Sequence, residues 1–123
     1  MTYHTNKGDT MNSPWGEVQH ANPITGGVIM VQTAGHGGFM IMKEAMKKFH
    51  PALKLASVYG GSFMGGYTCF EEDCEAVAVI YEMQQAGIDI SAKGFKDITK
   101  ERVIESLGRT GTYEPYLKAR KLI

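Results

Sequence analysis

The sequence predicts an α+β fold, in which a small antiparallel sheet of three or four strands packs against a central apolar helix and further short helices. Three observations favour it. Strand-like apolar runs separated by glycines occupy the first half of the chain, helix-forming segments occupy the second half, and the composition is that of an ordinary globular domain. Hydrophobic residues make up 43% and charged residues 21% of the 123 residues. A chain of this length and composition can build one core.

The expected domain spans residues 14–123 and follows a mobile polar tail at residues 1–13. The tail is rich in small and polar residues and has no periodic apolar positions, which is typical of a terminus that does not pack. The fold should therefore begin near Pro14 and Trp15. No internal repeat or linker divides the rest of the sequence, so we expect a single domain.

Three segments in the first half predict the sheet. Residues 27–33 form the best strand, because they are mostly apolar and β-branched. Residues 17–21 are a shorter candidate strand, and the turn-forming residues 22–26 between the two predict a hairpin. Residues 39–41 extend the sheet after a run of glycines.

The helical segments follow. Residues 43–49 are good helix formers that stop before Pro51, and the four glycines of residues 60–66 predict a loop. The central helix is expected over about 71–86, because acidic residues occupy its start and a glycine follows its end. The remaining expectations are a strand at 88–91, a helix capped by Thr99 that runs through Leu107, and a last basic helix at 113–121.

Charge and targeting signals exclude some classes of protein. The formal net charge is zero, although residues 67–92 hold six acidic and no basic side chains, and residues 93–123 hold eight basic and four acidic ones. Such a balance does not indicate a nucleic-acid-binding domain. The sequence has no secretory signal pattern and no apolar stretch of membrane-spanning length, so we expect a cytoplasmic protein that does not bind membranes. The spacing of Cys69 and Cys74 fits neither a redox pair nor a zinc site.

One candidate site surrounds His36, which lies among glycines directly after the best strand, in the order Thr33-Ala34-Gly35-His36-Gly37-Gly38. Glycines allow the backbone to approach a ligand closely and to direct consecutive N–H groups toward an anion. His36 is therefore a candidate acid or base, and its neighbours Thr33, Gly35, Gly37 and Gly38 are candidate ligand-binding residues. The competing interpretation is a tight turn with a hydrogen-bonded histidine. Neither this segment nor the 60–66 loop has the spacing of a nucleotide-binding motif.

A second candidate site is the run Glu71-Glu72-Asp73-Cys74 at the expected start of the central helix. In the catalytic interpretation, Asp73 or Glu72 orients His36 as a general base, and Cys74 is a nucleophile activated by the helix dipole. Neighbouring carboxylates oppose that activation, because they raise the pKa of a thiol. In the structural interpretation, the acids are ordinary first-turn residues and Cys74 is a small buried hydrophobe. No ligand spacing predicts a metal site, and no cofactor is expected.

These motifs, together with Pro14-Trp15-Gly16 and Gln19, resemble a small domain family of unknown function found in bacteriophage, prophage and plasmid-borne proteins. The resemblance covers residues 14 to about 82. That family often has Ser at the position of Gly35, and Asp and Trp at the positions of Glu75 and Ala76. The resemblance implies an origin in a mobile element and a site in which these residues work together: Trp15, His36, Glu71, Glu72, Asp73 and Cys74. Trp15 and Glu71 are thereby further candidate ligand-binding residues.

Hypotheses from different functional classes stay open. The first is a mobile-element protein that binds and inhibits or redirects a host protein or protein complex, for example in counter-defence; its size, segregated charge, and Met and aromatic content favour this hypothesis. The second is a small hydrolase or transferase that uses His36 with Asp73 or Glu72, and a third is a module for a nucleotide-like small molecule. A homodimer also stays open. Nucleic-acid binding is not expected, because a short basic helix is usually a solvated face.

Overall fold

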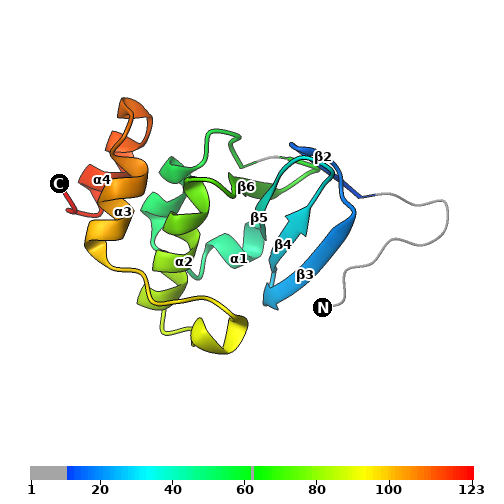
Figure 1. The fold of residues 1–123 in the computed structure, drawn as a ribbon, viewed down its shortest axis with the longest axis horizontal. Coiled ribbons are helices and arrows are strands. Elements are labelled where there is room, and N and C mark those ends of the chain that lie inside the picture. The colour runs from blue at the N-terminus through cyan, green and yellow to red at the C-terminus, as the bar shows by residue number, and fades with distance from the viewer. Residues whose placement is uncertain (1–10, 62) are drawn as a thin grey trace.

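The computed structural model describes residues 11–61 and 63–123, and within them it confirms the α+β fold. The helical elements, with η denoting a 3₁₀ helix, are α1 (Lys43–Met46), η1 (Pro51–Ala56), α2 (Glu75–Gln85), η2 (Ser91–Lys93), α3 (Lys100–Leu107), η3 (Gly111–Tyr113) and α4 (Glu114–Ala119). The strands are β1 (Asn12–Ser13), β2 (Gly16–Glu17), β3 (His20–Thr25), β4 (Val28–Gln32), β5 (Gly37–Met42) and β6 (Tyr67–Glu71). Figure 1 shows the larger sheet toward one end of the molecule and α3 and α4 at the other, with α2 between them.

The larger sheet is antiparallel with the strand order β3-β4-β5-β6, and β1 and β2 form a separate small sheet. The predicted hairpin between β3 and β4 is confirmed, but its turn lies at Gly26 and Gly27 rather than at residues 22–26. β3 continues through Pro23, which an edge strand tolerates because only one of its sides is hydrogen-bonded. Gly27 adopts a φ of 79°. A Cβ on this glycine would lie 2.6 Å from the Cβ of Ala45, so both the turn and the packing require glycine.

The central helix is shorter than expected. α2 begins at Glu75, because Glu71 is the last residue of β6 and residues 72–74 form the turn between them. The sequence pattern around the glycine-rich loop does not predict β6, although its aromatic and β-branched residues suit a strand. Its side chains alternate, with Phe70 packed in the core under the helices and Cys69 packed on the opposite face of the sheet. Most of the acidic run therefore precedes the helix instead of forming its first turn.

The remaining boundaries differ in smaller ways. Asn12 and Ser13 form β1, two residues before the expected start of the fold, and residues 1–10 of the predicted tail lie outside the described residues. Residues 88–91 form no strand. The helix capped by Thr99 is confirmed as α3, since the Thr99 hydroxyl accepts a hydrogen bond from the backbone N–H of Arg102 at 3.1 Å. The last helix is confirmed as α4, shortened to Glu114–Ala119.

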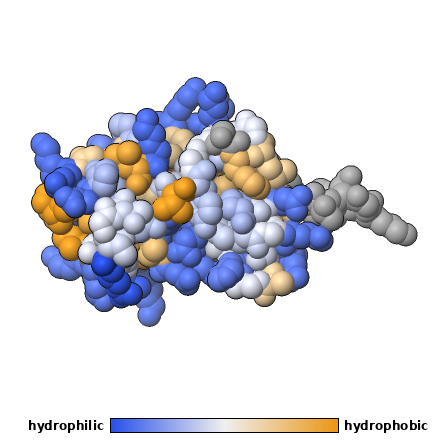
Figure 2. Space-filling view, turned by 90° about the horizontal axis from the view of Figure 1, so that it is seen from above, coloured by the Kyte–Doolittle hydropathy of each residue, from blue (hydrophilic) through white to orange (hydrophobic). Residues whose placement is uncertain are grey.

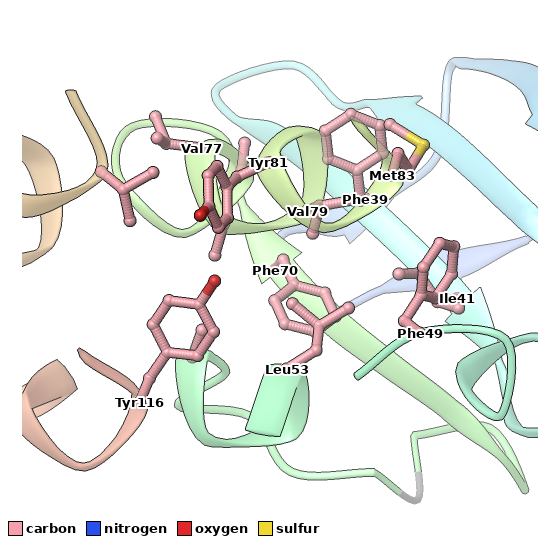
Figure 3. Close-up of a cluster of buried hydrophobic side chains, with 14 of the residues drawn as sticks. Phe39, Ile41, Phe49, Leu53, Phe70, Val77, Val79, Tyr81, Met83 and Tyr116 are labelled. Atoms are coloured by element: carbon pink, nitrogen blue, oxygen red, sulfur yellow. The ribbon is translucent and has the colours of Figure 1, made fainter. Parts of the chain in front are cut away.

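The larger sheet has a core on each face. In Figure 3, Phe39 and Phe70 of the strands meet Val79 and Met83 of α2, and Tyr116 of α4 points its hydroxyl toward α2. The second core lies on the opposite face and consists of Val18, Ile29, Val31, Met40 and Cys69, with Met11, Trp15, Ala21, Phe63 and Tyr67 packed against it. Because α2 covers one face and the small sheet and the loop before β6 approach the other, Trp15 lies against the face opposite α2.

Candidate functional site

The His36 segment is a tight turn between β4 and β5. The backbone N–H of Thr33 donates to the carbonyl of His36 at 2.8 Å. The Thr33 hydroxyl donates to the same carbonyl at 2.7 Å and accepts from the His36 N–H at 3.1 Å. This backbone geometry agrees with the structural interpretation of the segment, and the imidazole of His36 is exposed. Thr33 therefore closes the turn that presents His36 to solvent.

Two of the glycines beside His36 make room for neighbouring strands and side chains of the chain itself. Gly37 and Gly38 are buried in β5, whereas Gly35 is exposed with no heavy atom near the position of a Cβ. A Cβ on Gly38 would lie 2.5 Å from Cη2 of Trp15, and a Cβ on Gly37 would lie 3.2 Å from Oε2 of Glu72. The nearest atoms are nevertheless backbone carbonyl oxygens of the neighbouring strands, that of Val31 at 2.5 Å from the Gly37 position and that of Phe70 at 2.2 Å from the Gly38 position. These glycines therefore permit close strand packing as well as the approach of the Trp15 indole and the Glu72 carboxylate.

The two candidate clusters meet at one place. The backbone N–H of Glu72 donates to the carbonyl of Gly37 at 3.0 Å, which holds the turn before α2 against the start of β5. His36 and Glu72 share a shallow, open, polar pocket of about 250 Å³. The pocket is lined by Gln19, His20, Gln32, Thr33, Ala34, Gly35, His36 and Glu72. Neither Asp73 nor the candidate nucleophile Cys74 lines it, so of the two carboxylates expected to orient His36, Glu72 is the one placed beside it.

The acidic run instead surrounds a buried carboxylate that the sequence analysis did not select. Glu75 has an exposed fraction of 0%, and three donors reach its two oxygens. Oε1 accepts from the backbone N–H of Glu71 at 3.2 Å. Oε2 accepts from the backbone N–H of Val58 at 3.2 Å and from the hydroxyl of Tyr113 at 2.6 Å. Glu75 therefore joins three segments that are far apart in the sequence.

The titration of these groups follows from their burial. Desolvation raises the pKa of Glu75, while the hydrogen bonds from Tyr113, Glu71 and Val58 act in the opposite direction. Burial and the bond to Glu75 raise the pKa of the Tyr113 phenol, so it stays protonated and acts as the donor.

Cys74 lies at the edge of this network. Its thiol is 3.3 Å from Oε1 of Glu71 and 3.6 Å from the Tyr113 hydroxyl. Desolvation and the nearby carboxylates of Glu71 and Glu75 raise the pKa of the Cys74 thiol. A nucleophilic cysteine needs a depressed pKa, so this environment opposes the nucleophile hypothesis. Glu71 also accepts from the backbone N–H of Cys74 at 2.8 Å, and this bond closes the turn before α2.

A second buried carboxylate lies seven residues along α2. Glu82 is 1% exposed, accepts from the Tyr116 hydroxyl at 2.6 Å and pairs with Nε of Arg120 at 2.8 Å. Of these two acids, Glu82 has a signal in the sequence, because it follows an apolar run within the helix, whereas Glu75 ends the acidic run and has none. A buried acid needs donors, which two tyrosines and an arginine later in the sequence supply.

Trp15 forms the third part of the site. Its indole Nε1 donates to the Tyr59 hydroxyl at 3.0 Å, and the two rings meet edge to face with centroids 5.6 Å apart. Trp15 is half-buried, Tyr59 is 40% exposed and its neighbour Val58 is 54% exposed. We call Trp15, Val58 and Tyr59 the aromatic ridge, and Glu71, Glu72 and Asp73 the acidic turn. Glu75 bonds the backbone of both.

Metal and membrane sites can be assessed for residues 11–61 and 63–123. Among them, no group of three or more His, Cys, Asp or Glu side chains has a geometry that could hold a metal ion. None of the helices in this part of the chain combines the length and apolar character that a membrane span requires.

Comparison with known protein families yields a match that covers most of the chain. A family model described as "Domain of unknown function (DUF7007)" matches residues 8–110. The matched range includes the aromatic ridge, the His36 turn, the acidic turn and α2, and it ends before Tyr113. No curated protein and no solved structure matches the chain.

Proposed function

Because the chain belongs to the DUF7007 family, whose function is unknown, we propose a function from its own geometry: it is a protein-binding domain that acts through the aromatic ridge beside the acidic turn. The observation that carries the proposal is the exposure of the ridge. Val58 is 54% exposed and Tyr59, which contacts Trp15, is 40% exposed, although complete burial of a valine side chain would stabilise the fold by about 1.5–3 kcal/mol. Aromatic side chains such as those of Trp15 and Tyr59 are enriched at protein interfaces.

Exposed apolar residues concentrate near the ridge in sequence. Among the described residues, the large hydrophobic side chains that are exposed are Leu55, Val58, Tyr59, Met64 and Ile123. All but the last belong to the segment that precedes β6. Figure 2 shows that on the face it presents, apolar side chains form small groups separated by hydrophilic ones. Small groups suit a limited contact in which a few side chains carry most of the binding energy, rather than a broad obligate interface.

The acidic turn sets the chemistry of the partner. Glu72 and Asp73 are exposed, and the backbone of Glu71 is joined to that of Val58 through one carboxylate, so acids and ridge are neighbours. No basic residue lies in the 67–92 segment that includes the turn. The surface therefore fits a protein segment that places an apolar side chain on the ridge and Lys or Arg beside the acids.

The resemblance to proteins of phage, prophage and plasmids supports a biological setting for this proposal. In that setting the partner is a host protein, and the domain inhibits or redirects it by stoichiometric contact, as a counter-defence protein would. Such an activity requires about one domain for each target molecule.

The test compares one charge introduced at two exposed apolar positions. Val58→Lys places a cation on the ridge, where it repels a basic partner but is compatible with the nearby acidic turn. Ile123→Lys makes the same change at an exposed apolar residue of the C-terminal end, which lies away from β2 and the sheet in Figure 1. Partners enriched from host cells by the wild-type protein are purified, and affinity and stoichiometry are measured by calorimetry at two salt concentrations. We expect a one-to-one complex that V58K weakens by about tenfold or more and I123K leaves unchanged. Equal affinities for the two variants, or an effect that persists far below the target concentration, would contradict the proposal.

The pocket shared by His36 and Glu72 supports a second candidate, the binding or hydrolysis of a small polar ligand. Within the described residues, no hydrogen bond joins the His36 side chain to Glu72, so ligand binding is better supported than catalysis. Calorimetry with a panel of nucleotides and related anions tests this candidate, with His36→Ala as the comparison. Binding that H36A abolishes would favour it over the protein-binding function, and no heat with any compound in the panel would exclude it for those compounds.

A further inference from the structure

Two hydrogen bonds between tyrosine hydroxyls and glutamate carboxylates join the C-terminal segment to α2. Glu75 and Glu82 lie seven residues apart and therefore share one face of the helix. Tyr113 donates to the first carboxylate and Tyr116 to the second, both at 2.6 Å. Arg120 adds a charged bond to Glu82 at 2.8 Å. The C-terminal segment also packs against η1 and α3, so these hydrogen bonds to α2 are one part of its attachment to the domain.

The C-terminal segment has an exposed connection to α3 and one side that is buried against the rest of the domain. The residues that connect it to α3, from Gly108 to Gly111, are all exposed, and the family match ends at residue 110. On its inner side Tyr113, Tyr116 and Leu117 are buried. On its outer side Glu114 and Lys118 form an exposed ion pair at 2.6 Å. The inner side thus binds the matched domain, while the outer side faces water.

The Glu75 carboxylate links the C-terminal segment to the proposed binding surface. Oε2 of Glu75 accepts from both the Tyr113 hydroxyl and the Val58 backbone, and Oε1 accepts from the Glu71 backbone. The ridge and the acidic turn are therefore held by the same side chain that holds the C-terminal segment. If the segment leaves, water reaches Glu75, and a solvated carboxylate no longer needs the Val58 amide.

We infer that residues 111–122 are a latch, which detaches from α2, η1 and α3 as a unit and, when docked, holds the aromatic ridge and the acidic turn in their binding geometry. The latch itself is independent of any partner. Its effect on binding rests on the proposed function, so the two are tested by separate measurements on the full chain.

The first measurement is native-state amide hydrogen exchange, residue by residue. A latch predicts that amides of α4 exchange through a local opening, faster than those of α2 and β5. Tyr113→Phe should accelerate exchange in α4 by about tenfold, since it removes a bond to a buried carboxylate, while the rate in β5 stays unchanged. Tyr116→Phe should act similarly, and Glu114→Gln, which changes only the exposed pair, should have little effect. Exchange of α4 at the same rate as α2 and β5 in every variant would show that the segment is part of one cooperative unit and would overturn the latch.

The second measurement separates the two tyrosines. Of the two tyrosines, Tyr113 is the one that shares a carboxylate with the ridge. Y113F should therefore also accelerate exchange at the Val58 amide and weaken binding of a partner isolated with the wild-type protein, whereas Y116F should do neither to the same extent. If α4 loosens in both variants but Val58 and partner affinity do not change in Y113F, the coupling is wrong. If no partner is found, the exchange data still decide the latch, and the failure belongs to the proposed function alone.

Discussion

Replacement of Gly38 by alanine tests whether the glycines near His36 serve the packing of Trp15. A Cβ at this position would lie 2.2 Å from the carbonyl oxygen of Phe70, and 2.5 Å and 2.8 Å from Cη2 and Cζ2 of Trp15. The indole can move away, but the carbonyl belongs to the adjacent strand β6 and cannot. The added methyl group therefore has to displace Trp15 and also distort the sheet.

The magnitude follows from two opposing terms. Overpacking a well-packed site costs about 1–3 kcal/mol, and contact with a fixed backbone atom favours the upper part of that range. Replacing glycine by alanine lowers the entropy of the unfolded chain and returns about 0.4–1 kcal/mol. We expect Gly38→Ala to lower the free energy of unfolding by about 2 kcal/mol, which is about 8 °C in Tm for a domain of this size.

The assay uses the intrinsic fluorescence of Trp15, which is the one tryptophan in the chain. Denaturant titration of Gly38→Ala should show the loss of stability, and its native emission should shift to the red as the indole becomes solvated. Gly35→Ala is the matched control, because its Cβ meets no atom within 4 Å. If Gly38→Ala were as stable as Gly35→Ala and had the emission of the wild type, the packing argument would be refuted.

Three further predictions concern the buried network. Because burial raises the pKa of Glu75, the contribution of this carboxyl to stability is present at low pH and is lost as pH rises through that raised pKa. In denaturant titrations, the stability advantage of the wild type over Glu75→Gln should therefore shrink from pH 4 to pH 9. An advantage that grows with pH would contradict the direction of the pKa shift. The raised pKa of Cys74 predicts slow alkylation by iodoacetamide at pH 7, followed by mass spectrometry, and a rate typical of a free cysteine would oppose it. Arg120→Met should lower the free energy of unfolding by about 2 kcal/mol, because the buried Glu82 loses its charged partner. Lys118→Met removes only an exposed ion pair and should not change the stability measurably.

Local features could be predicted from the sequence where neighbouring residues decide them. The strand at residues 28–32 follows from its apolar β-branched composition, and α3 follows from the Thr99 cap and the glycine after Leu107. The start of α2 could not be located this way. An acidic run suits a first helical turn, but pairing of Glu71 with Gly38 across the sheet keeps that residue in β6. Propensity over a few residues cannot include a partner more than thirty residues away.

The candidate site shows the same limit. The motifs at Trp15, His36 and the acidic run are visible in the sequence, and the structure places them around the ends of β5 and β6. Their relations are not visible: that Gly38 accommodates Trp15, and that Glu72 rather than Asp73 lines the pocket with His36. The first fact depends on which face of β5 the Gly38 position takes, and a shift of one residue would reverse it. The second depends on how the turn after β6 is held against the start of β5 by the hydrogen bond from Glu72 to Gly37.

The sequence by itself determined the fold class, the strongest strand, the capped helix and the residues that carry unusual chemistry, because composition, periodicity and capping act over a few neighbouring residues. Only the tertiary structure decided which acid matters. Glu75 is one of several carboxylates in a row, and its burial arises because Val58, Glu71 and Tyr113 converge on it from three separate segments. A buried carboxylate is stable only where such donors meet, and their meeting is a property of the packed chain.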